Sequence, residues 1–169
     1  MLTEMILEEH SKAQKDKIVA WISTHQKRFD ELVEIFLTGE PIVTQRAAWP
    51  LSYAAIAHPQ LVKKHLKKII TNLEKPNLHN AVKRNTIRLL QFVDIPKSLQ
   101  GEVMNICFSY IEDPKEAIAV KAFSLGVLQN LSRQYPEILP EIKMIIESRW
   151  EHETAAFKSR AKKIVASYE

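Results

Sequence analysis

The chain has 169 residues, of which 46% are hydrophobic and 26% are charged, with 3 Gly, 8 Pro and 1 Cys. This composition is that of a soluble globular domain and excludes a wholly disordered chain. No apolar run approaches the roughly 20 residues of a membrane span, and no secretory signal is visible at the N-terminus. A single cysteine cannot form an internal disulfide, so we expect a cytoplasmic protein. Three glycines are too few for a glycine-rich phosphate loop.

The first predicted elements lie within residues 3–24, where we expect one or two helices. Ser11 and Gln14 have the spacing of a capping box ahead of the apolar residues Ile18 and Ile22. A polar cap is what the terminal unit of a stacked helical array requires. We therefore interpret residues 1–24 as an N-terminal cap.

From residue 25 onward the chain repeats. The repeat is marked by four cations that lie 37, 38 and 37 residues apart, namely Arg46, Lys83, Lys121 and Lys158. Apolar residues follow each cation at offsets of 3, 6–7 and 10, which form one face of an α-helix. Prolines recur twice per period, and proline stops one helix and suits the first turn of the next. Each repeat is therefore predicted to contain two helices.

The predicted repeats lie near 25–59, 60–96, 97–136 and 137–169, within one domain that spans 1–169. Their first helices are predicted at 26–38, 60–74, 97–112 and 137–150, and their second helices at 42–57, 79–94, 115–134 and 154–168. The run Asp113-Pro114-Lys115-Glu116 has the pattern of a helix start. Cys107 shares a column with Leu32, Ile69 and Met144, so we expect all four side chains to be buried and the thiol to be unreactive.

The residues that open the second helices resemble those of the HEAT-repeat family. These residues are Gln45-Arg46-Ala47-Ala48, Val82-Lys83-Arg84, Val120-Lys121-Ala122 and Phe157-Lys158-Ser159. The resemblance covers 25–169 and implies an all-α, right-handed α-α superhelix, that is, an armadillo-like solenoid of about four helical pairs. The acidic residue that precedes the cation in the family is irregular here, so no regular ladder of charge pairs between repeats is expected.

The chain is also similar to a group of short bacterial HEAT-like proteins, some of which are labelled adenylosuccinate lyase. Such a lyase is far longer and needs a flexible serine loop, which this sequence lacks. We therefore expect no lyase activity.

No metal, nucleotide or nucleophile motif stands out, and we expect no catalytic residue, cofactor or metal ion. Trp49 is interpreted as a core residue.

The second helices have an uneven charge. The windows 44–57, 80–93, 117–134 and 155–168 contain ten cations and no Asp or Glu. In HEAT-like solenoids the second helices line the concave surface, so the resemblance implies a basic groove. Continuing the register places Ala47, Leu51 and Ala54 in this groove, together with the candidate partner-binding residues Arg84, Arg88, Gln91, Gln129 and Lys163. Secondary candidates are Arg46, Lys83, Lys121, Lys158 and Arg160.

The sequence favours a non-enzymatic scaffold or adaptor that binds an acidic peptide or protein segment in this groove. The alternative is a nucleic-acid-binding module related to HEAT-like DNA repair proteins. A basic face that binds only solvent also stays open. The run Lys63-Lys64-His65-Leu66-Lys67-Lys68 is interpreted as the solvated face of an amphipathic helix. The sequence does not indicate an oligomeric state.

Overall fold

The computed structural model describes residues 1–167 and contains no strand within that range. The all-α class predicted from the sequence is therefore confirmed for the described chain. No helix in this range is long and apolar enough to cross a membrane. The chain forms two compact units, Met1–Ile95 (unit 1) and Pro96–Glu169 (unit 2), and each is described by itself. The expectation that they act as a single domain stays a prediction.

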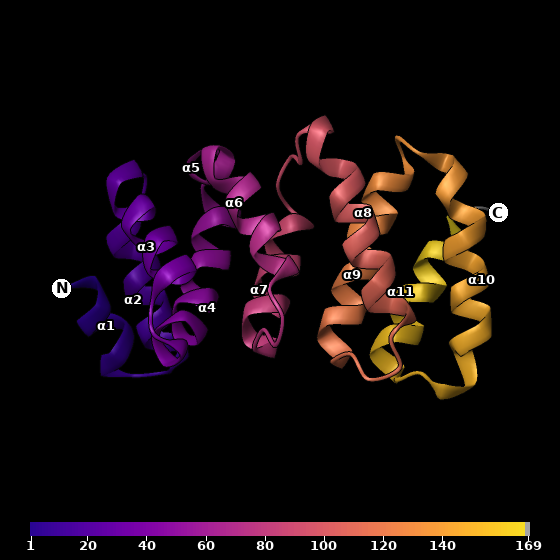
Figure 1. Cartoon of the computed structure of the whole chain (residues 1–169), viewed down its shortest axis with the longest axis horizontal. Helices are drawn as coiled ribbons and strands as arrows, with labels where there is room; N and C mark the ends of the chain where they lie inside the picture. Colours follow the sequence, from indigo (N-terminus) through magenta and orange to yellow (C-terminus); the bar gives the residue numbers. More distant parts are fainter. Residues whose placement is uncertain (168–169) are drawn as a thin grey trace. The chain divides into compact units, whose positions relative to one another are not determined.

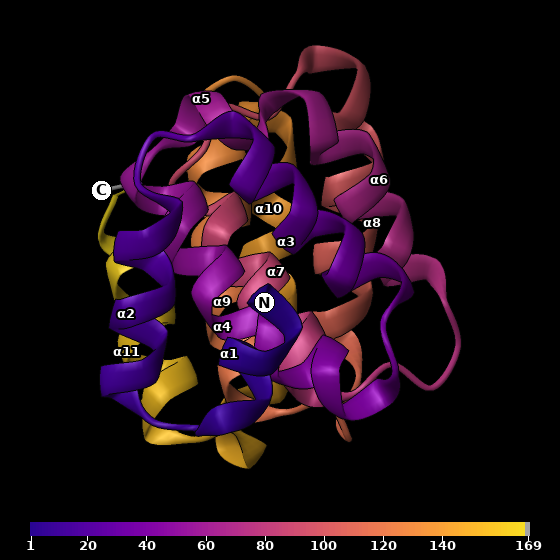
Figure 2. The same ribbon diagram turned by 90° about the vertical axis from the view of Figure 1, so that its left-hand side faces the viewer.

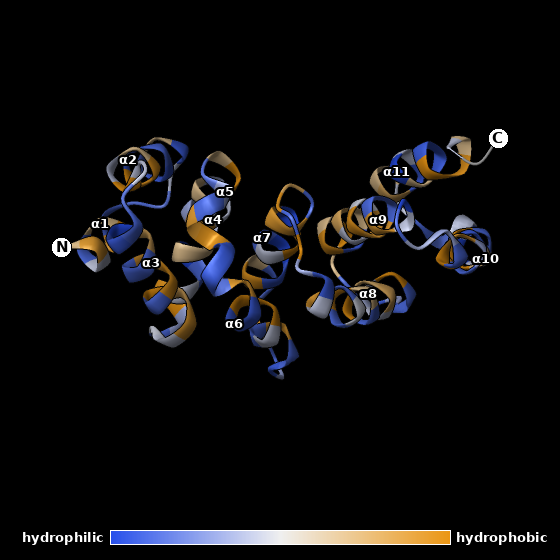
Figure 3. Ribbon diagram, turned by 90° about the horizontal axis from the view of Figure 1, so that it is seen from above, coloured by the Kyte–Doolittle hydropathy of each residue, from blue (hydrophilic) through white to orange (hydrophobic). Residues whose placement is uncertain are grey.

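Unit 1 is built from successive helical pairs (Figure 1). The first pair is α1 (Leu2–Glu8) and α2 (Lys12–Ile22), and the second is α3 (Gln26–Thr38) and α4 (Pro41–Ala57). The third pair ends with α7 (Asn80–Leu90) and begins with four short pieces, α5 (Pro59–Val62), η1 (Lys63–His65), α6 (Leu66–Thr71) and η2 (Asn72–Glu74). Seen from above, α3 and α6 lie on one side of unit 1 and α2 and α7 on the other (Figure 3).

The centre of unit 1 is α4, which packs against α1, α2, α3 and α7. Viewed from the N-terminal end, α1 and α2 lie in front of α4 (Figure 2). On α4, the side chains of Ala47, Leu51 and Ala54 are at most 1% exposed. This burial corrects the prediction that those three residues line a groove. Residues 1–24 thus form a further stacked pair rather than only a polar cap.

The predicted capping box at Ser11 is half confirmed. The Ser11 hydroxyl accepts a hydrogen bond from the backbone N–H of Gln14 at 3.1 Å and so caps α2. The Gln14 amide does not return to Ser11, because it donates instead to the carbonyl of Met5 at 2.6 Å and to the carboxylate of Glu8 at 3.1 Å. Gln14 therefore ties the start of α2 to α1.

The described part of unit 2 contains two helical pairs. The first pair is α8 (Lys97–Glu112) and α9 (Ile118–Ser132). The second follows η3 (Pro136–Ile138) and consists of α10 (Leu139–Arg149), η4 (Trp150–His152) and α11 (Ala155–Ala166). The predicted last helix, 154–168, thus matches α11, although its final residue lies outside the described residues.

Two predictions within unit 2 are wrong. Asp113 does not start a helix, because its carboxylate accepts the N–H of Lys115 at 2.8 Å in a turn, and α9 begins only at Ile118. Met144 is 62% exposed, while its neighbours Ile145 and Ile146 are buried, so the assumed column was shifted by one residue.

The prediction for Cys107 is confirmed, since its side chain is fully buried. Burial raises the pKa of this thiol to about 12. A thiol with this pKa is almost wholly protonated at neutral pH, and the thiolate is the reactive form. Cys107 is therefore a packing residue.

Candidate functional site

One side of α7 combines cations with an exposed aromatic ring. Arg84, Arg88 and Phe92 are spaced four residues apart, which places them on the same side of a helix. Phe92 lies one turn beyond Arg88 and continues the helical path, because its N–H bonds to the carbonyl of Leu89 at 3.0 Å. Arg84 is exposed, Arg88 is half-buried, and Phe92 is 61% exposed. We call these three residues the α7 stripe.

A buried polar contact sets the rotation of α7 against α4. Asn85 is 2% exposed, and its side-chain oxygen accepts the hydroxyl proton of Ser52 at 3.2 Å. Its amide nitrogen donates to the carbonyl of Ala81 at 2.8 Å. Because the bond to Ala81 lies within α7, turning the helix would break the contact with Ser52 and leave the buried Asn85 oxygen unsatisfied, at a cost of about 1–3 kcal/mol. The α7 stripe is thus directed outward by a contact of its own unit.

Tyr53 of α4 lies beside the stripe and is flanked by two cations. The Arg88 guanidinium carbon lies 5.3 Å from the centre of the Tyr53 ring, and the Lys15 ammonium nitrogen lies 3.9 Å from it. Both distances fall in the range of cation–π attraction. Lys15 comes from α2, is 6% exposed and also pairs with Asp16, whereas Tyr53 remains 39% exposed. An exposed ring is thus held in place by groups from two other helices.

Trp49 lies one turn before Tyr53 on α4 and is half-buried. The His10 ring meets it edge-on at 5.7 Å, and the Lys15 ammonium lies 5.8 Å from its centre. These contacts join α4 to α2 and to the turn that precedes it. Trp49 is therefore a packing residue at the border of the core rather than deep within it.

The net positive charge of the protein belongs to unit 1. Residues 1–95 contain 14 Lys and Arg against 10 Asp and Glu, while residues 96–169 contain ten of each. Within unit 1, α7 has Lys83, Arg84 and Arg88 and no acidic residue. The outer lysines are partly neutralised, because Lys64 pairs with Asp30 at 2.7 Å and His65 bonds the same carboxylate at 2.6 Å. The α7 stripe therefore lies in the part of the chain that attracts anions most.

Among the column of repeated cations, Arg46 packs between neighbouring helical pairs, whereas Lys158 contacts a residue of its own pair. Arg46 donates to the carbonyl of Leu7 at 2.9 Å and so ties α1 to α4. Lys158 lies over the Trp150 ring at 5.5 Å. Lys83 is half-buried and is also engaged by neighbouring groups. The repeated spacing predicts contacts with a partner, but Arg46 instead makes a contact within unit 1.

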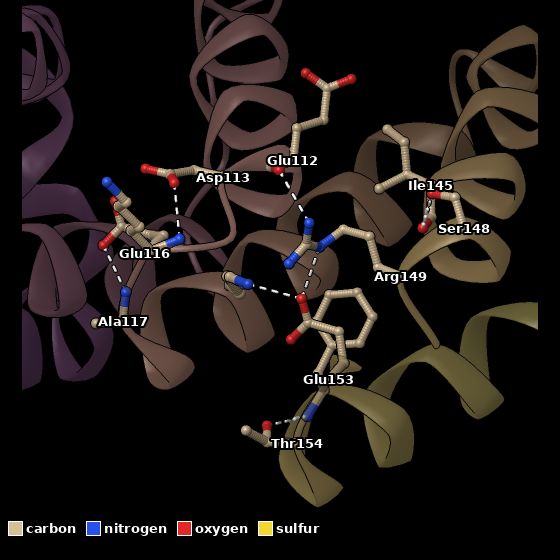
Figure 4. Close-up of polar contacts among 12 residues, drawn as sticks. Glu112, Asp113, Glu116, Ala117, Ile145, Ser148, Arg149, Glu153 and Thr154 are labelled. Carbon is tan, nitrogen blue, oxygen red and sulfur yellow. Dashed lines mark hydrogen bonds and ion pairs between the residues drawn. The ribbon is translucent and has the colours of Figure 1, made fainter. Parts of the chain in front are cut away.

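Lys121 requires a correction as a partner contact, because its side chain is only 5% exposed. Its ammonium and the Nε of Arg149 each lie 2.7 Å from Oε1 of Glu153, whose side chain is 4% exposed. Figure 4 shows the side chains of Arg149 and Glu153 directed toward each other. Arg149 also donates to the carbonyl of Glu112 at 3.3 Å. Burial raises the pKa of Glu153, but the hydrogen bonds from Lys121 and Arg149 outweigh that effect and hold the pKa below its ordinary value. This ion triad joins the two pairs of unit 2, although no regular ladder of charge pairs was expected.

The remaining candidates divide between the units. Gln91 is half-buried at the end of α7, close in sequence to the α7 stripe. Gln129 of α9 and Arg160 of α11 are half-buried, and Lys163 of α11 is exposed, all in unit 2. The site built here therefore consists of unit 1 residues alone. Sequence reasoning missed Tyr53 and Phe92, although the spacing of Phe92 four residues after Arg88 is a usable signal.

Within each unit, helical pairs stack on one another, which is the packing that defines an α-solenoid protein. A scan of family models matches residues 2–168 to the HEAT repeat domain, and the chain belongs to that family. The match includes α1 and α2, which agrees with their packing as a pair. Searches of the curated proteins and of the solved structures gave no match.

HEAT repeats generally serve as protein-interaction scaffolds, and the resemblance to lyase-labelled proteins receives no support. Within residues 1–167, no cluster of His, Cys, Asp or Glu is arranged to hold a metal ion.

Proposed function

We propose that this protein is a non-enzymatic scaffold that binds an acidic protein segment on the surface formed by the α7 stripe and Tyr53. The observation that carries the proposal is the placement of Arg84, Arg88 and Phe92 in one line beside an exposed, cation-flanked tyrosine. Arg and Tyr are enriched among the residues that dominate binding energy at protein interfaces. Phe92 and Tyr53 add exposed apolar area that a bound segment can bury, which a surface of isolated cations does not offer.

The spacing of the stripe indicates the form of the bound segment. Arg84 and Arg88 are one helical turn apart, which is about 6 Å along the axis. Carboxylates two residues apart on an extended chain are separated by roughly 6.6 Å, and those four apart on a helix by about 6 Å. Either arrangement presents one carboxylate to each guanidinium, which can bind it through two parallel hydrogen bonds. An apolar residue next to the acidic pair would contact Phe92.

A duplex nucleic acid fits this surface less well. Phosphate binding depends on an extended array of cations, whereas the α7 stripe supplies two arginines with two aromatic rings. One lysine on the outer side of unit 1, Lys64, is already paired with Asp30 and so does not extend the array. Burial raises the pKa of Asp30, but hydrogen bonds from Lys64, His65 and Gln26 lower it to about 2, so this carboxylate is charged at neutral pH. The test must therefore distinguish binding of nucleic acid from binding of an acidic peptide.

The test measures binding of a fluorescent peptide in which Glu alternates with Leu and Phe, by fluorescence anisotropy. A matched peptide with Gln in place of Glu is the reference. The double change Arg84→Glu and Arg88→Glu should weaken binding of the acidic peptide at least about tenfold, because attraction becomes repulsion at both contacts. The control is Lys63→Glu with Lys67→Glu, at exposed positions on η1 and α6, and it should change the affinity little. Circular dichroism checks that both variants remain helical.

Two results would overturn the proposal. The first is that the Lys63/Lys67 variant loses binding while the Arg84/Arg88 variant retains it, which would move the functional surface to the outer helices. The second is tighter binding of a labelled oligonucleotide than of the peptide, with a steep dependence on salt. Each phosphate neutralised on a duplex contributes about 0.9 to the slope of log affinity against log salt, so a slope of several units indicates nucleic acid.

A further inference from the structure

A cleft of about 650 Å³ opens between α10 and α11 in unit 2. Its apolar lining comes from Ile146 and Trp150 on one side and Val165 on the other. Charged residues border it unequally, with Glu147 and Glu151 on the side of α10 and η4 and Lys162 on the side of α11. We call this feature the end cleft. All of its lining residues belong to the described part of unit 2.

The repeat shows what kind of surface the end cleft is. Lys158, Lys162 and Val165 lie 37 residues after Lys121, Leu125 and Leu128. In α9 those three residues are at most 4% exposed, and α11 packs on that helix. On α11 the corresponding Lys162 is exposed and Val165 only half-buried. The end cleft therefore includes the face of α11 that corresponds to the face of α9 covered in the fold. On α11 this face is accessible.

The charges on the end cleft indicate what would cover it. A polypeptide rich in one sign would meet one favourable side and one unfavourable side, since the two sides carry opposite charge. A second copy of the same face, turned about a two-fold axis parallel to the helices, brings the side of α10 and η4 opposite α11 of its partner. Glu147 and Glu151 of one copy then face Lys162 of the other, and the same contact occurs twice, as a two-fold interface requires.

Lys158 gives independent support for an acidic group at this face. The equivalent residue in the preceding repeat, Lys121, is neutralised by Glu153 from the pair that covers it. Lys158 instead has its ammonium over the Trp150 ring. Glu151 of a second copy would approach Lys158 from the side on which Glu153 approaches Lys121. We infer that the end cleft is a self-association surface that pairs two copies of this chain through unit 2.

The test uses charge reversal and mixing, followed by sedimentation velocity. The unmodified protein should form a dimer whose fraction rises with protein concentration. Glu147→Lys with Glu151→Lys, and separately Lys162→Glu, should each raise the dimer dissociation constant by about 100-fold, because like charges would then face each other in both halves of the interface. When the two variants are mixed, a heterodimer should form, since each half then pairs opposite charges.

Val165→Glu places a charge in the apolar part of the cleft and should also leave the protein monomeric. The charge-reversal residues are exposed, so their variants are expected to fold, and circular dichroism verifies this. A monomeric unmodified protein at every concentration, or variants that fail to recover a dimer on mixing, would overturn the inference. The Arg84→Glu and Arg88→Glu variant should dimerise normally, so failure of the peptide-binding proposal is distinguishable from failure here.

Discussion

Glu153 holds two cations in a region of unit 2 that water hardly reaches. Its side chain is 4% exposed, and Lys121 and Arg149 share one of its oxygens. Replacing Glu153 by Gln removes the negative charge and leaves a buried ammonium without a counter-ion. Removing one partner of a buried pair typically costs about 3–5 kcal/mol. We therefore expect Glu153→Gln to lower the free energy of unfolding by roughly 3 kcal/mol, as measured by urea denaturation.

The pH dependence of that effect has a defined sign. The pKa of Glu153 is lowered in the folded state from its ordinary value of 4.5. The stabilising contribution is therefore complete above pH 4.5 and is lost as the pH falls through the lower, folded-state pKa. The difference in stability between the unmodified protein and the Gln variant should shrink across this acidic range. The control Glu141→Gln, at an exposed carboxylate of the same unit, should change stability little. Equal losses for the two variants would contradict the structural role of Glu153.

Single residues show where sequence reasoning succeeds and where it stops. The burial of Cys107 could be predicted, because its place in an apolar column reflects the helix face on which it lies. Lys121 and Arg84 could not be told apart in that way, because both are cations on second helices. Whether a face is solvated depends on the neighbouring pair that packs on it, and Lys121 is covered by residues more than 25 positions later in the chain. Arg84 stays exposed, whereas Tyr53, which contacts Arg88, belongs to an apolar column of the repeat and gave no signal of a surface role.

At the scale of an element, α2 depends on its N-terminal cap. The hydroxyl of Ser11 accepts a hydrogen bond from the N–H of Gln14, which is one of the backbone groups that a helix start leaves unpaired. Substituting Ala for a serine cap typically costs about 1 kcal/mol. We expect Ser11→Ala to reduce the free energy of unfolding by about that amount in a chemical denaturation experiment.

The matched control for the cap is Ser109→Ala on the exposed side of α8, where alanine replaces serine within a helix. This change should be neutral or slightly stabilising, because alanine has the higher helix propensity. If the two substitutions have the same effect, the hydroxyl of Ser11 contributes nothing beyond propensity. Fraying of α2 would also loosen Lys15, the α2 residue that lies against Tyr53.

The helices themselves were largely predictable, because a period of 37–38 residues places each apolar face. The bounds of α3 and α8 equal the predicted 26–38 and 97–112. The predicted helix 60–74 is instead four short pieces, and the pattern contains no signal for the 3-10 turn at Lys63–His65. The stacking of α1 was missed because a helix of 7 residues is too short to show a period.

At the scale of the whole molecule, the net positive charge lies in unit 1, and this distinguishes two interpretations of the basic surface. The sequence alone suggests one groove with contributions from every second helix, including Gln129 and Lys163. The arrangement within unit 1 instead brings Arg88 of α7 to the ring of Tyr53 on α4, while unit 2 has as many acidic as basic residues. An acidic ligand is steered toward positive potential, and exposed charges act over a screening length of about 8 Å at physiological ionic strength.

This difference predicts which half of the protein responds to an acidic peptide. In a titration of isotope-labelled protein followed by NMR, the backbone amides of α4 and α7 should shift, with the largest changes near Tyr53, Arg88 and Phe92. The amides of α9 and α11 should stay unchanged at the same peptide concentration, because unit 2 offers no net positive charge. Shifts centred on Gln129 and Lys163 would instead favour a groove shared by all the second helices, since only a ligand lying along both units would perturb those residues together with Arg84.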